Sequence, residues 1–320
     1  MSEIIRVEHL KKFFKTPSGA MLHAVDDVSF TINEGETLGV VGESGCGKST
    51  LGRVAIKLLD QTDGKIFFDG EDITEINERK NMELRKKMQI IFQDPYSSLN
   101  PRFCVLELIA DPLRAYKMYG SAARKEKVFE LMDMVGLARR FAYSYPHELD
   151  GGRRQRIGVA RALALNPKFI VCDEPVSALD VSIQAQMLNL LQDLQEQQGL
   201  TYMFVTHDLS VVKHISTDIL VMYLGVMVEK SPVEELFEKP LHPYTKGLLS
   251  AIPVPSIDVE RKRVELMGEL SSPVEPPDEC RFLSRCLYAT DICRQKAPTY
   301  EEILPKHFVS CHNARKINDM

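Results

Sequence analysis

The sequence lacks any apolar run long enough to cross a lipid bilayer. Its longest such run, residues 219–228, is interrupted by Gly225 and is much shorter than the ~20 residues that a membrane helix needs. The opening residues, MSEIIRVEHLKKFF, also lack the apolar core of a secretory leader. We therefore expect a chain that is soluble by itself and cytoplasmic. If it acts at a membrane, other chains must supply the spans.

Positive charge is not in excess either. The chain has 40 Lys and Arg against 45 Asp and Glu, a net charge of −5, whereas nucleic-acid binders are usually basic. We expect no nucleic-acid partner. The sequence has no internal repeat, no low-complexity tract and no long heptad run. Its 320 residues, 44% of them hydrophobic, suffice for one large core and a small second unit.

The seven cysteines lack the C-x2-C pairs that are usual for zinc. Cys46, Cys104 and Cys172 are scattered. Four more, separated by 5, 6 and 17 residues, lie near the end at Cys280, Cys286, Cys293 and Cys311. Without a secretory leader they indicate metal binding or free thiols rather than disulfides. Four thiolates suit an iron–sulfur cluster, with zinc and free thiols as alternatives.

The sequence does contain a glycine-rich loop, GESGCGKST at residues 42–50, between an apolar strand pattern and a helical one. Glycines let backbone N–H groups face phosphate oxygens, and the following helix adds its positive end. Lys48 is predicted to reach the β- and γ-phosphates of ATP and Ser49 to bind Mg²⁺. The predicted ATP-binding set is Gly42, Ser44, Gly45, Cys46, Gly47, Lys48, Ser49 and Thr50. The alternative, an accidental glycine-rich turn, is disfavoured by this context.

A second motif, FIVCDE at residues 169–174, ends an apolar strand in two carboxylates. Such a strand would deliver Asp173 beside the metal, and Glu174 could polarise the attacking water. The alternative is a pair of carboxylates in a turn before Pro175. That alternative is weak when a P-loop precedes the strand.

In this order the motifs resemble those of the nucleotide-binding subunits of ABC transporters. The resemblance implies that Gln93, in IIFQDPYSSLNP, is the Q-loop residue that ligates Mg²⁺ and contacts membrane subunits. It implies a D-loop at residues 177–180, and it makes His207, in VTHD, the switch histidine at the γ-phosphate. Phe14 is the first choice for stacking on adenine, and Phe13 is the second.

The resemblance implies an α/β fold: a P-loop NTPase core of the ABC ATPase type, with an antiparallel β subdomain and a helical subdomain. We place the ATPase domain at residues 1–251, its helical subdomain at about 101–160, and a proline-rich linker with a small cysteine-containing C-terminal unit at 252–320. Alternation in the first 40 residues predicts antiparallel strands. Periodicity predicts further strands at 37–41, 65–68, 88–92, 169–172 and 202–206, helices at 49–59, 105–116, 122–135 and 181–197, and an edge hairpin at 219–229.

Three segments narrow the resemblance to the oligopeptide/dipeptide importers, and to their F-type ATPase: YSSLNPR, SALDVSIQAQ and LHPYTKGLLSAIP. That group implies ATP-driven peptide import from the cytoplasmic face of the membrane, where the chain would be peripheral. The implied partners are a second ATPase subunit, usually a different D-type chain, two transmembrane permease subunits, and an extracellular or periplasmic substrate-binding protein. The cysteine tail is similar to one that can bind a 4Fe–4S cluster.

The chain departs from the family at the signature, Leu/Phe-Ser-Gly-Gly-Gln. Here Asp150 replaces the serine and Arg153 the glutamine, around Gly151 and Gly152. In the family this segment caps the γ-phosphate bound by the opposite subunit, where a carboxylate would meet a like charge. The hypothesis is one slow composite site. Asp150 could equally serve the fold as a helix N-cap, with Arg153 offsetting its charge.

Two other functions stay open. A non-transport ABC ATPase of repair or translation would usually show a long coiled coil or tandem ATPase units. A mainly ATP-binding regulatory subunit is suggested by the altered signature, whereas Glu174, His207 and Gln93 argue against it.

Overall fold

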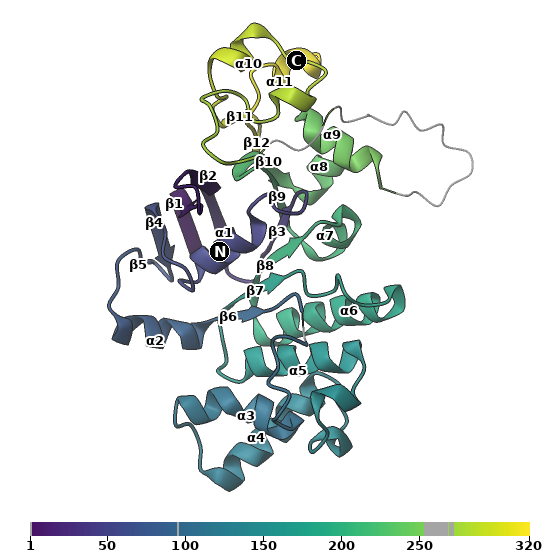
Figure 1. Cartoon of the computed structure of the whole chain (residues 1–320). Helices are drawn as coiled ribbons and strands as arrows, with labels where there is room; N and C mark the ends of the chain where they lie inside the picture. Colours follow the sequence, from purple (N-terminus) through teal and green to yellow (C-terminus); the bar gives the residue numbers. More distant parts are fainter. Residues whose placement is uncertain (1, 95, 253–267, 269–271) are drawn as a thin grey trace, which may run out of the picture. The chain divides into compact units, whose positions relative to one another are not determined.

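The structure of this chain, a computed structural model, describes residues 2–94, 96–252, 268 and 272–320. It divides into two compact units, which we describe separately (Figure 1). The P-loop unit consists of Glu3–Ile32, Thr37–Thr74 and the described residues from Phe204 onward. The signature unit consists mainly of Asn33–Glu36 and Glu75–Met203.

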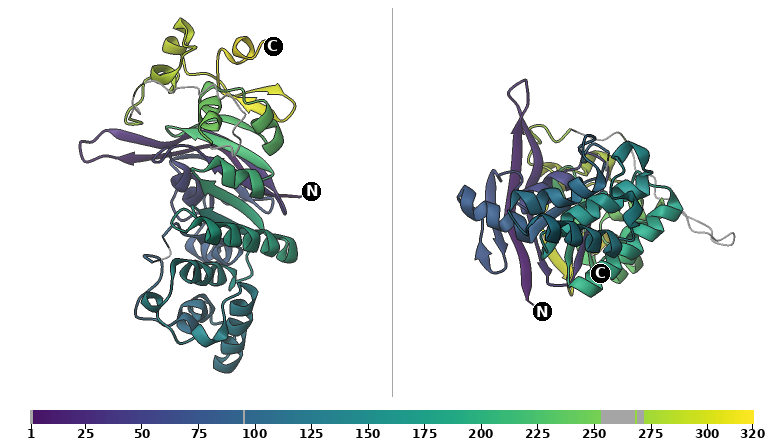
Figure 2. Two further views of the ribbon diagram at one scale, coloured as in Figure 1. Left: turned by 90° about the vertical axis from the view of Figure 1, so that its right-hand side faces the viewer. Right: turned by 90° about the horizontal axis from the view of Figure 1, so that it is seen from below.

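Two sheets build the P-loop unit. The first is antiparallel and has the strand order β2 (Met21–Asn33), β1 (Glu3–Lys15), β4 (Asp63–Phe68) and β5 (Glu71–Asp72). Its long β1–β2 ribbon is prominent in Figure 2. In the second sheet the consecutive neighbours are β11 (Glu301–Leu304), β12 (His307–Val309), β10 (Val226–Pro232), β9 (Asp218–Tyr223) and β3 (Thr37–Val41). Every residue of β3 is buried, and β3 leads directly into the glycine-rich loop.

Short helices surround these strands. They are α1 (Lys48–Ala55), α7 (Leu209–Ile215), α8 (Val233–Glu238), α9 (Pro243–Ser250), α10 (Asp291–Gln295), α11 (Ala314–Ile317) and the 3₁₀ turn η3 (Leu283–Arg285). The helix predicted at 49–59 ends earlier, at Ala55. It stops because Lys57 adopts a left-handed φ of 56° and its buried ammonium donates to the Gln61 side chain (2.7 Å) and the Thr74 carbonyl (2.9 Å).

The C-terminal residues belong to the P-loop unit, because β12 pairs with β10. A buried carboxylate, that of Glu229, strengthens this join. It accepts hydrogen bonds from the N–H groups of Leu241 (2.6 Å) and His242 (3.0 Å) and lies 2.7 Å from Nε2 of His307. The hairpin predicted at 219–229 forms, whereas its predicted position at a sheet edge is wrong. Neither strand is an edge, since β9 pairs with β3 and β10 with β12, whose partner strand is far away in sequence.

The signature unit combines a parallel strand pair with packed helices. β6 (Met88–Ile91) lies parallel to β7 (Phe169–Asp173), and α3 (Val105–Ala115), α4 (Ser121–Met134) and α5 (Gly151–Leu163) pack on one another. The remaining elements are α2 (Glu78–Lys87), α6 (Val181–Gln198) and the 3₁₀ turns η1 (Arg139–Phe141) and η2 (Pro146–Glu148). The chain passes to the P-loop unit within β8 (Thr201–Thr206).

These elements confirm the predicted α/β class with its antiparallel and helical parts. Helix α2 was not expected, because Leu84 is its one buried residue and no apolar period marks it. The linker prolines Pro253 and Pro255 lie outside the described residues, and the boundary at residue 251 stays a prediction. Among the described residues, no helix is both long and apolar enough to span a membrane.

Candidate functional site

The glycine-rich loop joins the end of β3 to the start of α1, as the sequence predicts. Gly47 has a φ of 104° that favours glycine, and a Cβ there would lie 1.9 Å from the carbonyl oxygen of Ala24. At Gly42 a Cβ would lie 2.3 Å from the carbonyl oxygen of Met222. The loop is therefore pressed against two other segments of its unit, which set its path.

Lys48 is buried within this loop. Its Nζ donates to the carbonyl oxygens of Gly42 (2.8 Å) and Glu43 (2.9 Å). Helix α1 starts at Lys48 without a side-chain cap and carries Ser49 and Thr50 in its first turn. An uncapped helix N-terminus beside a lysine is suited to bind phosphate.

Three further loop residues differ in exposure. Ser44 and Gly45 lie exposed at the outer turn of the loop. Cys46 is buried, and burial raises the pKa of its thiol, although the ammonium of Lys48 acts in the opposite direction. Cys46 therefore contributes backbone and packing rather than a reactive thiolate.

The two aromatic candidates are consecutive residues of β1. The ring of Phe13 stacks on the imidazole of His23, with centroids 3.9 Å apart. Phe14 is half-buried, and Nζ of Lys12 lies 5.0 Å from its ring centroid. Because His23 already occupies one face of Phe13, Phe14 stays the better candidate for stacking.

His207 lies exposed in the P-loop unit, directly after β8. Asp208 caps helix α7 by accepting a hydrogen bond from the N–H of Ser210 (2.8 Å). This cap determines where β8 gives way to α7, and it holds His207 at the junction.

In the signature unit, β7 delivers the two predicted carboxylates. Asp173 is its buried last residue, and Glu174 follows with a φ of 47°, which is unfavourable for a residue other than glycine. Nε2 of Gln93 donates to Oε2 of Glu174 at 2.8 Å. The fold thus brings the predicted Q-loop glutamine and the predicted catalytic carboxylate into contact, although 81 residues separate them.

The altered signature opens helix α5. Oδ1 of Asp150 accepts a hydrogen bond from the N–H of Arg153 (2.8 Å), and its Oδ2 pairs with the Arg153 guanidinium (2.5 Å). The predicted N-cap and charge pairing are confirmed. A Cβ on Gly152 would lie 2.8 Å from the Ile183 side chain, so this glycine allows α5 to approach α6 closely.

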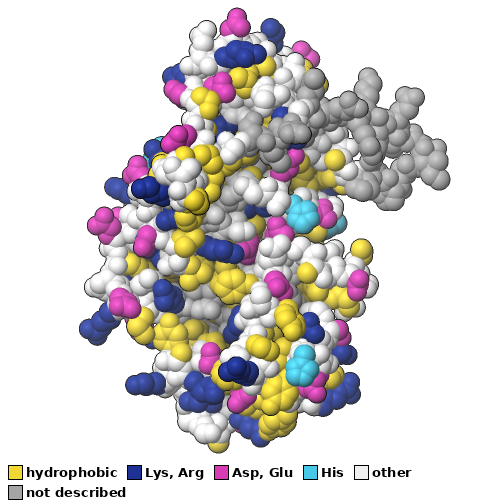
Figure 3. Space-filling model, in the orientation of Figure 1, with side chains coloured by type: hydrophobic (Ala, Val, Ile, Leu, Met, Phe, Trp, Pro, Cys, Tyr) yellow, Lys and Arg dark blue, Asp and Glu magenta, His cyan; other side chains and the backbone are white. Residues whose placement is uncertain are grey.

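The predicted D-loop follows Glu174 and is held by hydrogen bonds to backbone carbonyl oxygens. Ser177 donates from N–H (3.3 Å) and Oγ (3.1 Å) to the carbonyl oxygen of Glu174, and Gln184 donates to the carbonyl of Leu179 (3.0 Å). Val181 just beyond is 82% exposed. Large apolar side chains are also exposed in the helical part at Tyr96, Tyr143 and Tyr145. Figure 3 shows hydrophobic side chains among basic ones in this part of the molecule.

The predicted iron–sulfur cluster is wrong. Among the described residues, which include Cys280, Cys286, Cys293 and Cys311, no group of three or more His, Cys, Asp or Glu side chains could hold a metal ion. All four are free thiols. Burial raises the pKa of Cys280 to about 12 and that of Cys311 to about 11, so both are neutral thiols near neutral pH. The zinc alternative fails because, among the described residues, no such group of ligands lies together.

Two residues that the motifs did not reveal also contact the P-loop. The N–H of Glu43 donates to the Tyr244 hydroxyl (2.9 Å), and its carboxylate pairs with Arg285 (2.8 Å). Both were missed because 201 and 242 residues separate them from Glu43. The available signal was their position in two conspicuous segments, LHPYTKGLL and CRFLSRC.

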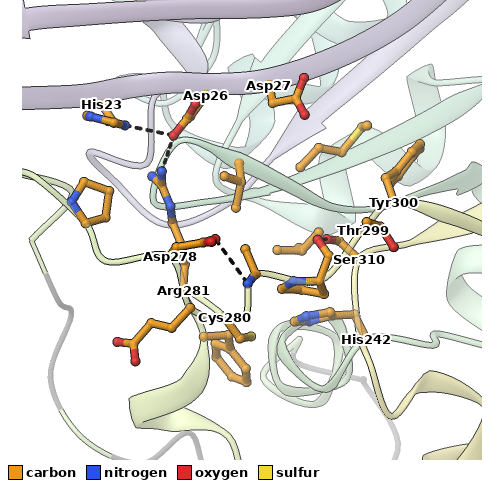
Figure 4. A pocket seen from close by; sticks show the side chains of 18 of the residues that line it. His23, Asp26, Asp27, His242, Asp278, Cys280, Arg281, Thr299, Tyr300 and Ser310 are labelled. Carbon is orange, nitrogen blue, oxygen red and sulfur yellow. Dashed lines mark hydrogen bonds and ion pairs between the residues drawn. The ribbon is translucent and has the colours of Figure 1, made fainter. Parts of the chain in front are cut away.

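A cavity of about 770 Å³ lies elsewhere in the P-loop unit, lined by β2, β10 and the C-terminal segment (Figure 4). Its walls include Asp26, Asp278, Arg281 and Tyr300. No residue of the glycine-rich loop lines it, so this cavity is distinct from the predicted phosphate site.

Comparisons with known proteins agree with these motifs. The family "ABC transporter" matches residues 25–177, and "Oligopeptide/dipeptide transporter, C-terminal region" matches residues 228–293. The oligopeptide transport ATP-binding protein AppF of Bacillus subtilis is 52% identical over 318 residues, covering 97% of both chains. OppF of Salmonella typhimurium is 52% identical over 305 residues, covering 94% of this chain and 90% of its own.

A solved dimeric structure, the post-hydrolysis state of the ATP-binding cassette MJ0796 bound to ADP and Pi, has a TM-score of 0.66 to this chain. It is 30% identical, and the match covers 72% of this chain and 99% of that one. The predicted recognition is confirmed: the chain belongs to the family of ABC transporter ATP-binding proteins, within the group of oligopeptide transport ATP-binding proteins.

Proposed function

We propose that this chain binds and hydrolyses ATP to power the import of oligopeptides or dipeptides. The observation that carries the proposal is the glycine-rich loop, with Lys48 buried and hydrogen-bonded at the start of α1. The relatives named for oligopeptide transport supply the cargo class.

In the proposed reaction, water attacks the γ-phosphorus, the bond to the β-phosphate oxygen breaks, and ADP and phosphate leave. The loop N–H groups and Lys48 would bind the phosphates, Phe14 the adenine and His207 the γ-phosphate. Glu174 would orient the water and take its proton. Ser49, Gln93 and Asp173 would hold Mg²⁺, which neutralises phosphate charge when bound.

The contact between Gln93 and Glu174 supports a control point in this scheme. While the Gln93 amide donates to Glu174, one carboxylate oxygen is engaged and less able to accept a proton from water. Movement of Gln93 toward Mg²⁺ would release that oxygen. Partner binding near the Q-loop could in this way be coupled to catalysis.

The signature supports a dimeric arrangement with unequal sites. We propose that a second ATPase subunit, a different D-type chain, completes each site. The two ATPase subunits would lie beneath two transmembrane permease subunits. A substrate-binding protein outside the membrane would deliver the peptide to these permeases. The chain would be peripheral at the cytoplasmic face. In the site formed by the partner's P-loop and this signature, Asp150 would place a carboxylate near the γ-phosphate and slow hydrolysis.

The test is ATP turnover by the chain co-purified with its neighbouring subunits. Glu174→Gln is expected to lower turnover at least ~100-fold, the lower range for losing a general base, while ATP binding is retained. Glu196→Gln, an exposed carboxylate on α6, is the matched control. A mainly ATP-binding regulatory subunit would instead show turnover that Glu174→Gln leaves unchanged.

A further inference from the structure

The C-terminal segment Cys280–Cys286 carries two paired arginines, and one of them, Arg285, contacts the glycine-rich loop of the proposed nucleotide site. Arg285 is nearly buried, and its two terminal nitrogens bond the two carboxylate oxygens of Glu43 at 2.8 and 3.1 Å. Arg281 pairs with Asp26 and donates to the carbonyl oxygen of Leu224. A two-point contact such as that of Arg285 with Glu43 fixes orientation as well as distance.

Glu43 is held at each of its polar groups. Arg285 binds its carboxylate, its N–H donates to the Tyr244 hydroxyl, and its carbonyl oxygen accepts from Lys48. The position of the Lys48 ammonium therefore depends on how Glu43 is oriented. Through Glu43, Arg285 acts on the lysine that is proposed to bind phosphate.

The second arginine, Arg281, contacts strand β2 through Asp26. Asp26, which pairs with Arg281, also lies 2.8 Å from Nδ1 of His23, as Figure 4 shows. The ring of His23 stacks on Phe13, the residue before the proposed adenine-stacking Phe14. One segment of the tail thus contacts Glu43 of the glycine-rich loop and, through Asp26 and His23, strand β1, which carries Phe14.

Stability alone is a weak explanation for this arrangement. Burying a charged pair costs desolvation that its mutual attraction often only offsets. Among the described residues, Arg285 Nε is also buried without a hydrogen-bond partner, which adds a further cost. The pair is better explained by the orientation that it imposes on Glu43.

We propose that Arg285 is a positioning residue for nucleotide binding, and that the segment Cys280–Cys286 is a structural part of the ATP site. This inference rests on the proposed ATP-binding function and adds to it a role for the C-terminal region. It does not require the tail to touch ATP.

The experiment measures the Kd of MgATP for the full chain. Arg285→Gln is expected to weaken binding about tenfold, the ratio that 1.4 kcal/mol produces. Arg285→Lys, which keeps the charge but not the fork, should recover part of the affinity. Glu43→Gln should resemble Arg285→Gln, and the double variant should be no weaker than either single one. Arg294→Gln, an exposed arginine in α10, is the control.

Each result decides the matter. If the unchanged chain does not bind MgATP, the proposed function fails. If it binds and folded Arg285→Gln binds equally well, this inference alone fails. It also fails if the effects of the two single variants multiply in the double variant, or if the loss in affinity matches a loss of folded protein seen in thermal melts.

Discussion

The glycine-rich loop of the P-loop unit and the altered signature of the signature unit are held by contacts of different range. In the P-loop unit, the loop is confined by Ala24 and Met222, and Glu43 is bound by side chains more than 200 residues away. In the signature unit, Asp150 is exposed and its partner, Arg153, is three residues along the chain. One group of contacts needs the whole fold, whereas the other needs only the start of a helix.

This difference teaches what each unit can do alone. A loop confined on several sides is arranged before its ligand arrives, so little ordering entropy remains to be lost on binding. Exposed groups such as the Asp150 carboxylate, which caps its own helix, and the Val181 side chain present a surface instead. That division suits a site completed by a second subunit.

The largest effect is expected from a substitution in the confined glycine-rich loop. Gly47→Ala places a Cβ against the Ala24 carbonyl oxygen, which is backbone and cannot move aside. We expect loss of MgATP binding and a fall of about 3 kcal/mol or more in the free energy of unfolding. Gly19→Ala, also at positive φ but with open space around it, should cost only about 1 kcal/mol. Equal losses in urea unfolding would contradict the confinement argument.

The next largest effect tests how strongly Glu229 holds the C-terminal residues to the rest of the P-loop unit. Glu229→Ala leaves the N–H groups of Leu241 and His242 and the imidazole of His307 without their shared acceptor. We expect a loss of about 3 kcal/mol in urea unfolding. Glu238→Ala, an exposed carboxylate in α8, should change it little. A small effect at both positions would show that the tail packs independently of Glu229.

The pH dependence of stability should distinguish a buried histidine of the P-loop unit, His242, from an exposed histidine of the signature unit, His147. Burial lowers the pKa of His242 to about 4 from 6.5, so the unfolded chain binds more protons between these values. The contribution of His242 to the free energy of unfolding is therefore fully present above pH 6.5. It falls toward pH 4, by about 2 kcal/mol at pH 5.

The substitution that checks this effect is His242→Asn. Asparagine can still accept the hydrogen bond from the Tyr244 N–H, and it does not titrate, so this part of the pH dependence should disappear. His147→Asn, at an exposed position of the signature unit, should leave the dependence intact. Urea unfolding at pH 5 and 7.5 measures both. An unchanged slope in His242→Asn would argue against burial as the cause.

The smallest effect is expected from substitutions of Asp150 in the altered signature. Asp150→Ser keeps a good N-cap and removes the carboxylate, so stability should change by less than about 1 kcal/mol. Steady-state ATPase of the assembled complex should rise by up to about twofold, because the restored site can at most match the site that is already competent. Asp150→Asn should raise it similarly, because it also removes the charge. No rise, or a fall, in both variants would rule out the charge as the cause of a slow site.

The sequence predicted those features correctly whose determining residues are close together in the chain. The strand, glycine-rich loop and helix at residues 37–55 are neighbours in the chain, and the cap of Asp150 on Arg153 spans one helical turn. Sequence reasoning found the hairpin of β9 and β10 but wrongly placed it at the sheet edge, because the covering strand β12 comes much later in the chain. It also failed at the cysteines, because spacing along the chain does not reveal whether four thiols converge or become buried.

By itself, the sequence determined the family, the ATP-binding loop and the identity of the candidate catalytic residues, because those depend on residue types at fixed local spacing. Only the tertiary structure decided that the tail joins the P-loop unit, that Arg285 and Tyr244 hold Glu43, and that Gln93 contacts Glu174. Those contacts join residues 78 to 242 positions apart. They depend on strand pairing and burial, which local sequence patterns do not encode.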